Sequence, residues 1–195
     1  MYYKKLVGKN IYLSPRTVDD AEQYTNWIND FETTDYLGRS NQIMTIEKEK
    51  EFLEKHIADE ATFNIVTLNE DKLIGSISLE NIYHTNRRAT LGIFIGDREE
   101  REKGYGTEAI RLILDYGFNY LNLNNINLDV MEFNDRAIAC YKKCGFKEIG
   151  RRRKSEFLDG KYYDRVSMDI LNEEFTEKYI LNRNIWTLGT DLKVH

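Results

Sequence analysis

An apolar run, a charged loop with two glycines and a long helical stretch follow one another between residues 91 and 121. Leu91, Ile93 and Ile95 alternate with their neighbours at period two, which predicts a half-buried strand. In residues 107–121 apolar side chains recur at a spacing of three to four, which predicts a helix with one stripe packed on a sheet. These side chains are Ala109, Leu112, Ile113, Tyr116 and Tyr120. A strand that leads through a loop into such a helix indicates a fold in which helices cover a β-sheet.

The loop of residues 97–106 has the properties of an anion site. The first turn of a helix leaves backbone N–H groups unpaired, and the helix dipole adds partial positive charge there. Gly104 and Gly106 allow a ligand to approach the backbone closely and allow a positive φ, while Arg101 and Lys103 add charge. We therefore expect a cradle for the pyrophosphate of a phosphorylated cofactor, with an ordinary glycine turn as the alternative.

The remaining segments alternate between strand and helix patterns. Gly92 interrupts an apolar strand, and such a glycine marks a bulge or a place where a backbone or a ligand comes close. The order is a strand meander followed by strand, helix, strand, helix and strand, which predicts a mixed α/β sheet with a central parallel crossover. Strands are expected at residues 11–13, 63–68, 72–79, 89–95 and 125–131 and between residues 146 and 171, with a hairpin turn at 158–161; helices are expected at 18–28, after Thr45, at 107–121 and from Asn134 to Gly145.

The composition narrows the class of protein. The 195 residues contain no Pro-, Gly- or Ser-rich linker, which favours a single domain, and the net charge of −5 argues against a general nucleic-acid binder. No apolar stretch has the length of a signal peptide core or a membrane span, so we expect a cytoplasmic protein without a membrane partner. Cys140 and Cys144 have no partners at metal-ligand spacing, so no metal site is expected.

Two motifs resemble the GNAT acyltransferases. Residues 101–107, REKGYGT, are similar to the loop with which that superfamily binds the pyrophosphate of acetyl-coenzyme A (acetyl-CoA). Residues 134–146, NDRAIACYKKCGF, are similar to its helix with an asparagine at the start and a tyrosine before the closing Gly-Phe. Residues 114–123 and 156–162 resemble the RimJ/RimL branch, which includes spermidine acetyltransferases.

The resemblance covers most of residues 10–171 and implies a GNAT-like, mostly antiparallel twisted sheet with flanking helices. We expect residues 1–172 to form the acetyltransferase domain and residues 173–195 to be a C-terminal extension, either a docking helix or a tail. Four apolar residues suit this extension for docking on the domain or on the second subunit of a homodimer, and both stay open. They are Phe175, Tyr179, Ile180 and Trp186.

The resemblance also implies roles for single residues. Tyr141 matches the family's general acid, which protonates the departing thiolate. Asn134 matches a cofactor-contacting asparagine, and a helix cap is an equally physical role for it. The strand before the loop would bind the pantetheine arm through its backbone. The expected cofactor-binding residues are Phe94, Ile95, Gly96, Arg101, Glu102, Lys103, Gly104, Tyr105, Gly106, Thr107 and Asn134.

The implied reaction is direct transfer of the acetyl group from acetyl-CoA to a primary amine, without a covalent enzyme intermediate. Many relatives have a glutamate in the fourth strand after an alanine, whereas Thr90 follows Ala89 here. The residue that accepts the proton of the amine is therefore open. A noncatalytic acyl-CoA sensor, with Thr90 as its supporting feature, is the alternative from another class. The candidate bases are Glu80, Glu32, Asp35 and His84.

The acceptor is expected to be a small polycation such as a polyamine. The chain is acidic, and Asp30, Glu32 and Asp35 lie in an irregular connection between residues 30 and 44 that we place on the substrate side. The likeness to spermidine acetyltransferases favours the same class. The likeness to the RimJ/RimL branch leaves a peptide N-terminus open as the alternative acceptor.

Overall fold

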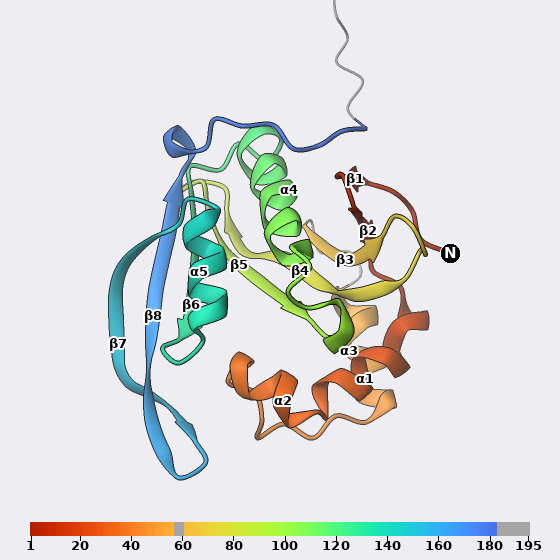
Figure 1. Ribbon diagram of the computed structural model, residues 1–195, viewed down its shortest axis with the longest axis vertical. Helices are drawn as coiled ribbons and strands as arrows, with labels where there is room; N and C mark the ends of the chain where they lie inside the picture. Colours follow the sequence, from red (N-terminus) through yellow and green to blue (C-terminus); the bar gives the residue numbers. More distant parts are fainter. Residues whose placement is uncertain (57–60, 183–195) are drawn as a thin grey trace, which may run out of the picture.

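The computed structural model describes residues 1–56 and 61–182. Its centre is one sheet with the strand order β1-β2-β3-β4-β5-β6-β8-β7 (Figure 1). Neighbouring strands are antiparallel except for β5 and β6, which run parallel. This arrangement confirms the mixed, mostly antiparallel sheet with a central parallel crossover. The strands are β1 (Leu6–Val7), β2 (Ile11–Pro15), β3 (Thr62–Thr67), β4 (Leu73–Tyr83), β5 (Arg88–Ile95), β6 (Asn125–Met131), β7 (Lys147–Leu158) and β8 (Lys161–Leu171).

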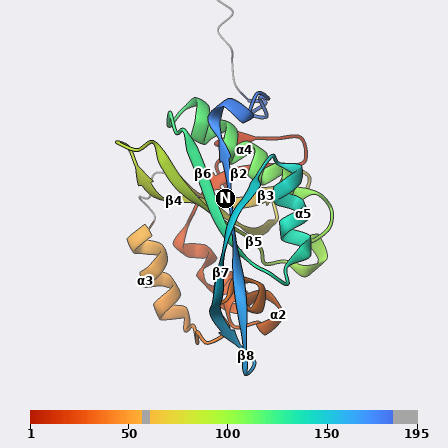
Figure 2. The same cartoon turned by 90° about the vertical axis from the view of Figure 1, so that its left-hand side faces the viewer.

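Helices cover both sides of the sheet. Figure 2 shows α4 and α5 on one side and α3 on the other. Tyr24 and Trp27 of α1 and Leu53 of α3 form a small second core, against which Phe94 of β5 packs. The connection of residues 30–44, expected to be irregular, contains two short helical turns. The helices are α1 (Ala21–Ile28), α2 (Phe31–Thr34), α3 (Ile46–His56), α4 (Tyr105–Asn119) and α5 (Asp135–Lys143), with 3₁₀ turns η1 (Val18–Asp20), η2 (Asp35–Leu37), η3 (Arg98–Glu100) and η4 (Asn172–Glu174).

Helix α4 differs from the prediction in its start and in its buried surface. It begins at Tyr105, two residues before the expected start. Tyr120, expected on the packed stripe, is 47% exposed. Ile110, Leu114 and Phe118, which lie beside the stripe, are buried as well. A second layer covers Phe118, because its ring lies 5.5 Å from the ring of Phe175 in the C-terminal segment.

The C-terminal segment, residues 173–182, runs from the end of β8 back over α4 toward β1 at the other edge of the sheet (Figure 1). Phe175, Tyr179 and Ile180 pack against the main core. The buried carboxylate of Asp115 accepts the backbone N–H groups of Tyr179 at 2.6 Å and Ile180 at 3.1 Å. These contacts place the segment on its own domain as an extended strap. Trp186 lies outside the described residues, and a homodimer stays a prediction.

Strands β5 and β6 separate after a short common stretch. Their register pairs only Arg88 to Thr90 with Asn125 to Asn127. Beyond Thr90, β5 keeps its partner β4 as far as Ile95, while β6 continues along β8. The backbone edge of residues 91–95 therefore faces a space between the two strands and not a neighbouring strand.

Within residues 1–56 and 61–182, no helix combines the length and the apolar character that a membrane crossing requires.

Candidate active site

A cleft of about 1090 Å³ occupies the space where β5 and β6 separate. The loop before α4 and helix α5 line it, with Gly104, Gly106 and Tyr141 among their residues. Helices α1 and α3 and strand β4 line it as well, with Glu49 and Ser76 among their residues. The cleft thus joins the expected cofactor loop to the expected substrate side of the domain.

The start of α4 offers open space and free backbone donors. Gly104 is the N-cap residue with a left-handed φ of +86°, and no side chain of the described residues caps this helix start. A Cβ added at Gly104 would meet nothing within 4 Å, and one added at Gly106 would meet only Ile95 Cγ1 at 3.9 Å. An uncapped first turn next to open space fits an anion such as a pyrophosphate.

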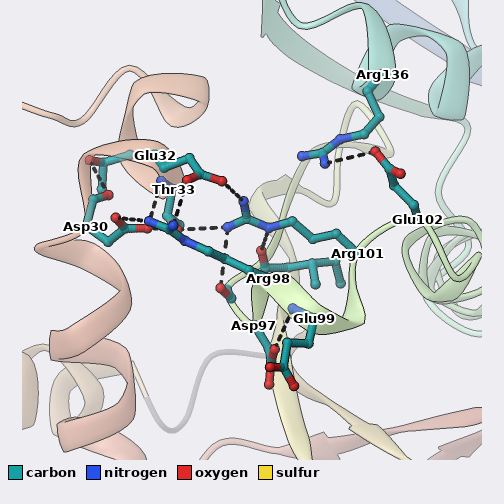
Figure 3. A network of polar contacts seen from close by, with 12 residues as sticks. Asp30, Glu32, Thr33, Asp97, Arg98, Glu99, Arg101, Glu102 and Arg136 are labelled. Atoms are coloured by element: carbon teal, nitrogen blue, oxygen red, sulfur yellow. Dashed lines mark hydrogen bonds and ion pairs between the residues drawn. The ribbon is translucent and has the colours of Figure 1, made fainter.

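Arg101 has a different set of contacts from the one expected. Its Nε donates to the carbonyl oxygen of Ile95 at 3.1 Å, and its Nη2 donates to Thr33 Oγ1 at 2.8 Å. Its Nη1 lies 3.5 Å from Glu32 Oε1. Figure 3 shows this side chain reaching from the loop toward α2. Arg101 therefore ties α2 to the end of β5, and the pyrophosphate contact expected of its charge stays a prediction.

The neighbouring charges of the loop are also paired. Lys103 Nζ lies 2.8 Å from Glu100 Oε2, and Glu100 Oε1 lies 3.0 Å from Lys72 Nζ. Glu102 has a positive φ of +64° and approaches Arg136 of α5 at 3.9 Å (Figure 3). Arg136 lines the cleft and brings a positive charge that the loop sequence did not reveal. Its only sequence signal is its position two residues after Asn134.

Four other expected cofactor residues have structural roles as well. A Cβ at Gly96 would lie 2.1 Å from the ring of Trp27, so this glycine is needed for α1 to pack on the end of β5. The side chain of Phe94 belongs to the same contact, with its ring 5.9 Å from that of Trp27. Tyr105 is half-buried against the main core, and Thr107 Oγ1 contacts Cys140 Sγ at 3.1 Å. The last contact joins α4 to α5.

Tyr141 and Asn134 are held by the ends of α5. Asn134 caps the helix, because its Oδ1 accepts the backbone N–H of Ala137 at 3.1 Å. Tyr141 packs its ring 5.8 Å from that of Phe146 and lines the cleft. Within the described part of the chain, its hydroxyl has no hydrogen-bond partner. Burial raises the pKa of Tyr141, so the hydroxyl keeps its proton at neutral pH and is suited to give it to a developing anion.

The candidate bases fall into two groups. Glu32 forms an ion pair with Arg98 at 2.6 Å, as does the neighbouring Asp30 at 2.5 Å, and the candidate Asp35 accepts a hydrogen bond from Ser40. These acidic side chains are therefore already paired within the protein. Glu80 and His84 line the cleft. Among residues 1–56 and 61–182, no cluster of His, Cys, Asp and Glu could hold a metal ion.

Glu49 of α3 is a functional candidate that the sequence analysis missed. It is 1% exposed, lines the cleft, and its Oε2 has no hydrogen-bond partner among the described residues. Burial raises the pKa of Glu49 from an ordinary value of 4.5 to about 7, while Arg16 and Arg39 oppose that shift. The sequence contained only a weak signal, a glutamate on the same helical face as Leu53.

Replacing Glu49 with glutamine is expected to stabilise the protein in alkaline solution. The folded state binds the Glu49 proton more tightly than the unfolded state, so its contribution to stability is full below pH 4.5 and is lost as the pH rises through about 7. Glu49→Gln should therefore raise the free energy of unfolding at pH 8 by up to about 3 kcal/mol and change it little at pH 4.5. Denaturant unfolding at both pH values measures this. Glu51→Gln, an exposed residue on the same helix, is the control, and an equal effect of the two variants would contradict the prediction.

Comparisons with known proteins agree with the geometry of this site. Residues 10–147 match a family model described as an acetyltransferase (GNAT) domain. The chain is 33% identical over 180 residues to the probable N-acetyltransferase YjcK of Bacillus subtilis, and this match covers 87% of this chain and 98% of the relative. It is 33% identical over 126 residues to the spermidine N(1)-acetyltransferase of Escherichia coli, covering 65% of this chain and 67% of the relative. The crystal structure of spermidine N-acetyltransferase from Vibrio cholerae in complex with CoA and spermine is similar with a TM-score of 0.77 and 30% identity, covering 85% of this chain and 97% of that chain.

Proposed function

We propose, from the premise that this chain belongs to the GNAT acetyltransferase family, that its acceptor substrate is a small polyamine. The chain is an acetyltransferase that moves the acetyl group of acetyl-CoA to an amine. The noncatalytic sensor considered from the sequence is therefore set aside. The proposal includes a cytoplasmic location, where acetyl-CoA and polyamines are both available.

The residues present fit acetyl-CoA as the co-substrate. The uncapped N–H groups at Gly104 to Thr107 would bind the pyrophosphate, with Arg136 supplying charge from α5. The edge of residues 91–95, which has left β6, would bind the pantetheine arm and stabilise the oxyanion that forms at the thioester carbonyl. Tyr141 would give its proton to the departing thiolate. Holding the amine and the thioester together in one cleft would supply much of the acceleration.

Two carboxylates in the cleft carry the proposal of a polycationic acceptor. Glu49 and Glu80 both line the cleft, and neither forms an ion pair within residues 1–56 and 61–182. Glu80 can therefore attract an ammonium group without first giving up a partner, and Glu49, whose pKa burial raises to about 7, can do so in the molecules in which it is ionised. The spermidine N-acetyltransferases among the relatives support the same class of substrate. The acidic connection at Asp30 and Glu32 supports it less than expected, because Arg98 and Arg101 already neutralise these side chains.

The proposal is tested by measuring acetylation of spermidine, spermine, a linear monoamine, an aminosugar and a peptide with a free N-terminus. We expect kcat/KM for spermidine to exceed that for the monoamine by about tenfold or more, and the ratio to fall with added salt, because salt screens exposed charges over about 8 Å. Turnover of the peptide above that of both polyamines would make the chain a protein N-terminal acetyltransferase. Equal efficiency on polyamine and monoamine would also contradict the proposal.

A further inference from the structure

Glu80 lines the cleft and is paired across two strands with Thr90, the residue at the position where many relatives have a glutamate. In the register of β4 and β5, Glu80 is paired with Thr90. Residues directly opposite each other on antiparallel strands share one face of the sheet, with Cβ atoms about 5 Å apart. Both residues line the cleft. A carboxylate at position 80 is therefore at about the same place on the sheet as a carboxylate at position 90 would be.

The carboxylate of Glu80 is held over Gly92. Ser78 Oγ donates a hydrogen bond to Glu80 Oε1 at 2.8 Å. A Cβ at Gly92 would lie 3.0 Å from this oxygen and 3.1 Å from Ser78 Oγ, so a side chain there would push both groups away. Gly92 belongs to the part of β5 that has left β6. The glycine that weakens the strand thus makes room for a carboxylate beside the edge that would hold the thioester.

The charges around Glu80 leave it available. Asp129 of β6 and Glu32 of α2, which also line the cleft, are paired with arginines. Glu80 accepts its hydrogen bond from a hydroxyl group, and within the described residues it forms no ion pair. Other titratable groups that line the cleft include Glu49 and His56 of α3, His84 between β4 and β5, and the arginines Arg16, Arg39 and Arg165.

We infer that Glu80 is the general base of the reaction and acts from β4 in place of a glutamate at position 90. The inference depends on the proposed acetyl transfer. The Glu80 carboxylate accepts one proton from the substrate ammonium, directly or through one water. The free amine nitrogen then attacks the thioester carbon, the C–N bond forms and the C–S bond breaks. The departing thiolate takes the proton of Tyr141, and the new amide nitrogen then gives its second proton to Tyr141, which restores the hydroxyl group. Glu80 finally releases its proton to solvent. One proton is therefore released for each acetyl group transferred.

The test is the pH dependence of spermidine acetylation by Glu80→Gln. Glutamine keeps the hydrogen bond with Ser78 but cannot take a proton. We expect kcat at pH 7.5 to fall by about 100-fold and the deficit to narrow as the pH approaches the pKa of the amine near 10, because the free amine then needs no base. The double variant Glu80→Gln, Thr90→Glu should recover about tenfold or more, because it returns a carboxylate to the same face of the sheet.

Wild-type turnover of spermidine in the same assay shows whether the proposed function itself holds. Glu70→Gln, in the turn between β3 and β4 outside the cleft, controls for the loss of one negative charge. A Glu80→Gln enzyme within about threefold of the wild type at pH 7.5, or a deficit that is equal at pH 7 and pH 10, would overturn the inference. A double variant no better than Glu80→Gln would contradict the equivalence of the two positions on which the inference depends.

Discussion

Tyr141→Phe is expected to lower kcat for amine acetylation by about 100-fold or more while leaving the Kd for CoA nearly unchanged. The variant removes only the hydroxyl group, and within the described residues that group has no hydrogen-bond partner. The ring contact with Phe146, which holds α5 against the core, is kept. Proton donation to the thiolate is therefore the one function that is lost. Steady-state kinetics and calorimetric titration with CoA measure the two quantities.

Tyr162→Phe is the matched control, because this tyrosine is 63% exposed near the tip of the β7–β8 hairpin and does not line the cleft. It should keep both kcat and the Kd for CoA. A Tyr141→Phe enzyme with nearly full kcat would mean that the thiolate leaves without a proton from the protein. Weaker CoA binding with unchanged kcat would instead make Tyr141 a binding residue.

Local patterns predicted the elements whose structure depends on nearby residues. The alternation of Ile126, Leu128 and Val130 predicted a strand at residues 125–131, and β6 has those bounds. Asn134 was expected to cap a helix, and its side chain does so. A helix was expected to run as far as Gly145, and α5 ends two residues before this glycine, which has a positive φ of +96°. Capping and period-two burial are decided within a few residues, so a sequence reveals them directly.

Contacts between distant segments could not be predicted in this way. Arg101 was expected to face the pyrophosphate, but its best-placed acceptors are Thr33 and the carbonyl oxygen of Ile95. Gly96 was expected to bind the cofactor, but a glycine is required there because a Cβ would collide with the ring of Trp27. Strand β1 was not expected at all, because two residues give no period and it exists only by pairing with β2. In each case the structure is decided by a contact with another segment, and no regular pattern in the sequence indicates that contact.

The acidic connection shows how such contacts change a functional argument. Asp30 and Glu32 were expected to attract a polycation, but at the start of α2 they lie close to Arg98 and Arg101 of the loop before α4 and form ion pairs with them. Neutralising Glu32 would therefore remove one ion-pair partner from each of two arginines next to the expected cofactor site. An effect of that change on polyamine turnover would not separate substrate attraction from loop order, whereas changes at Glu80 touch neither arginine.

Gly106→Val is expected to weaken CoA binding by about 100-fold, and Lys103→Ala by less than about threefold. In the free protein a Cβ at Gly106 would meet only Ile95 Cγ1 at 3.9 Å, so the variant should fold. The same Cβ would stand in the space that a pyrophosphate needs to reach the first-turn N–H groups. Lys103, by contrast, is about half exposed and already paired with Glu100, so its charge is screened.

Gly106→Ala separates this effect from stability. Alanine in the first turn of α4 should leave thermal unfolding of the ligand-free protein unchanged or raise the unfolding free energy by about 0.5 kcal/mol, yet it should still weaken CoA binding. Gly104→Ala should in addition destabilise the protein, because Gly104 has a φ of +86°. Thermal unfolding and calorimetric titration with CoA on all four variants measure both quantities. If Lys103→Ala weakened binding more than Gly106→Val, the affinity would come from side-chain charge and the backbone cradle would be wrong.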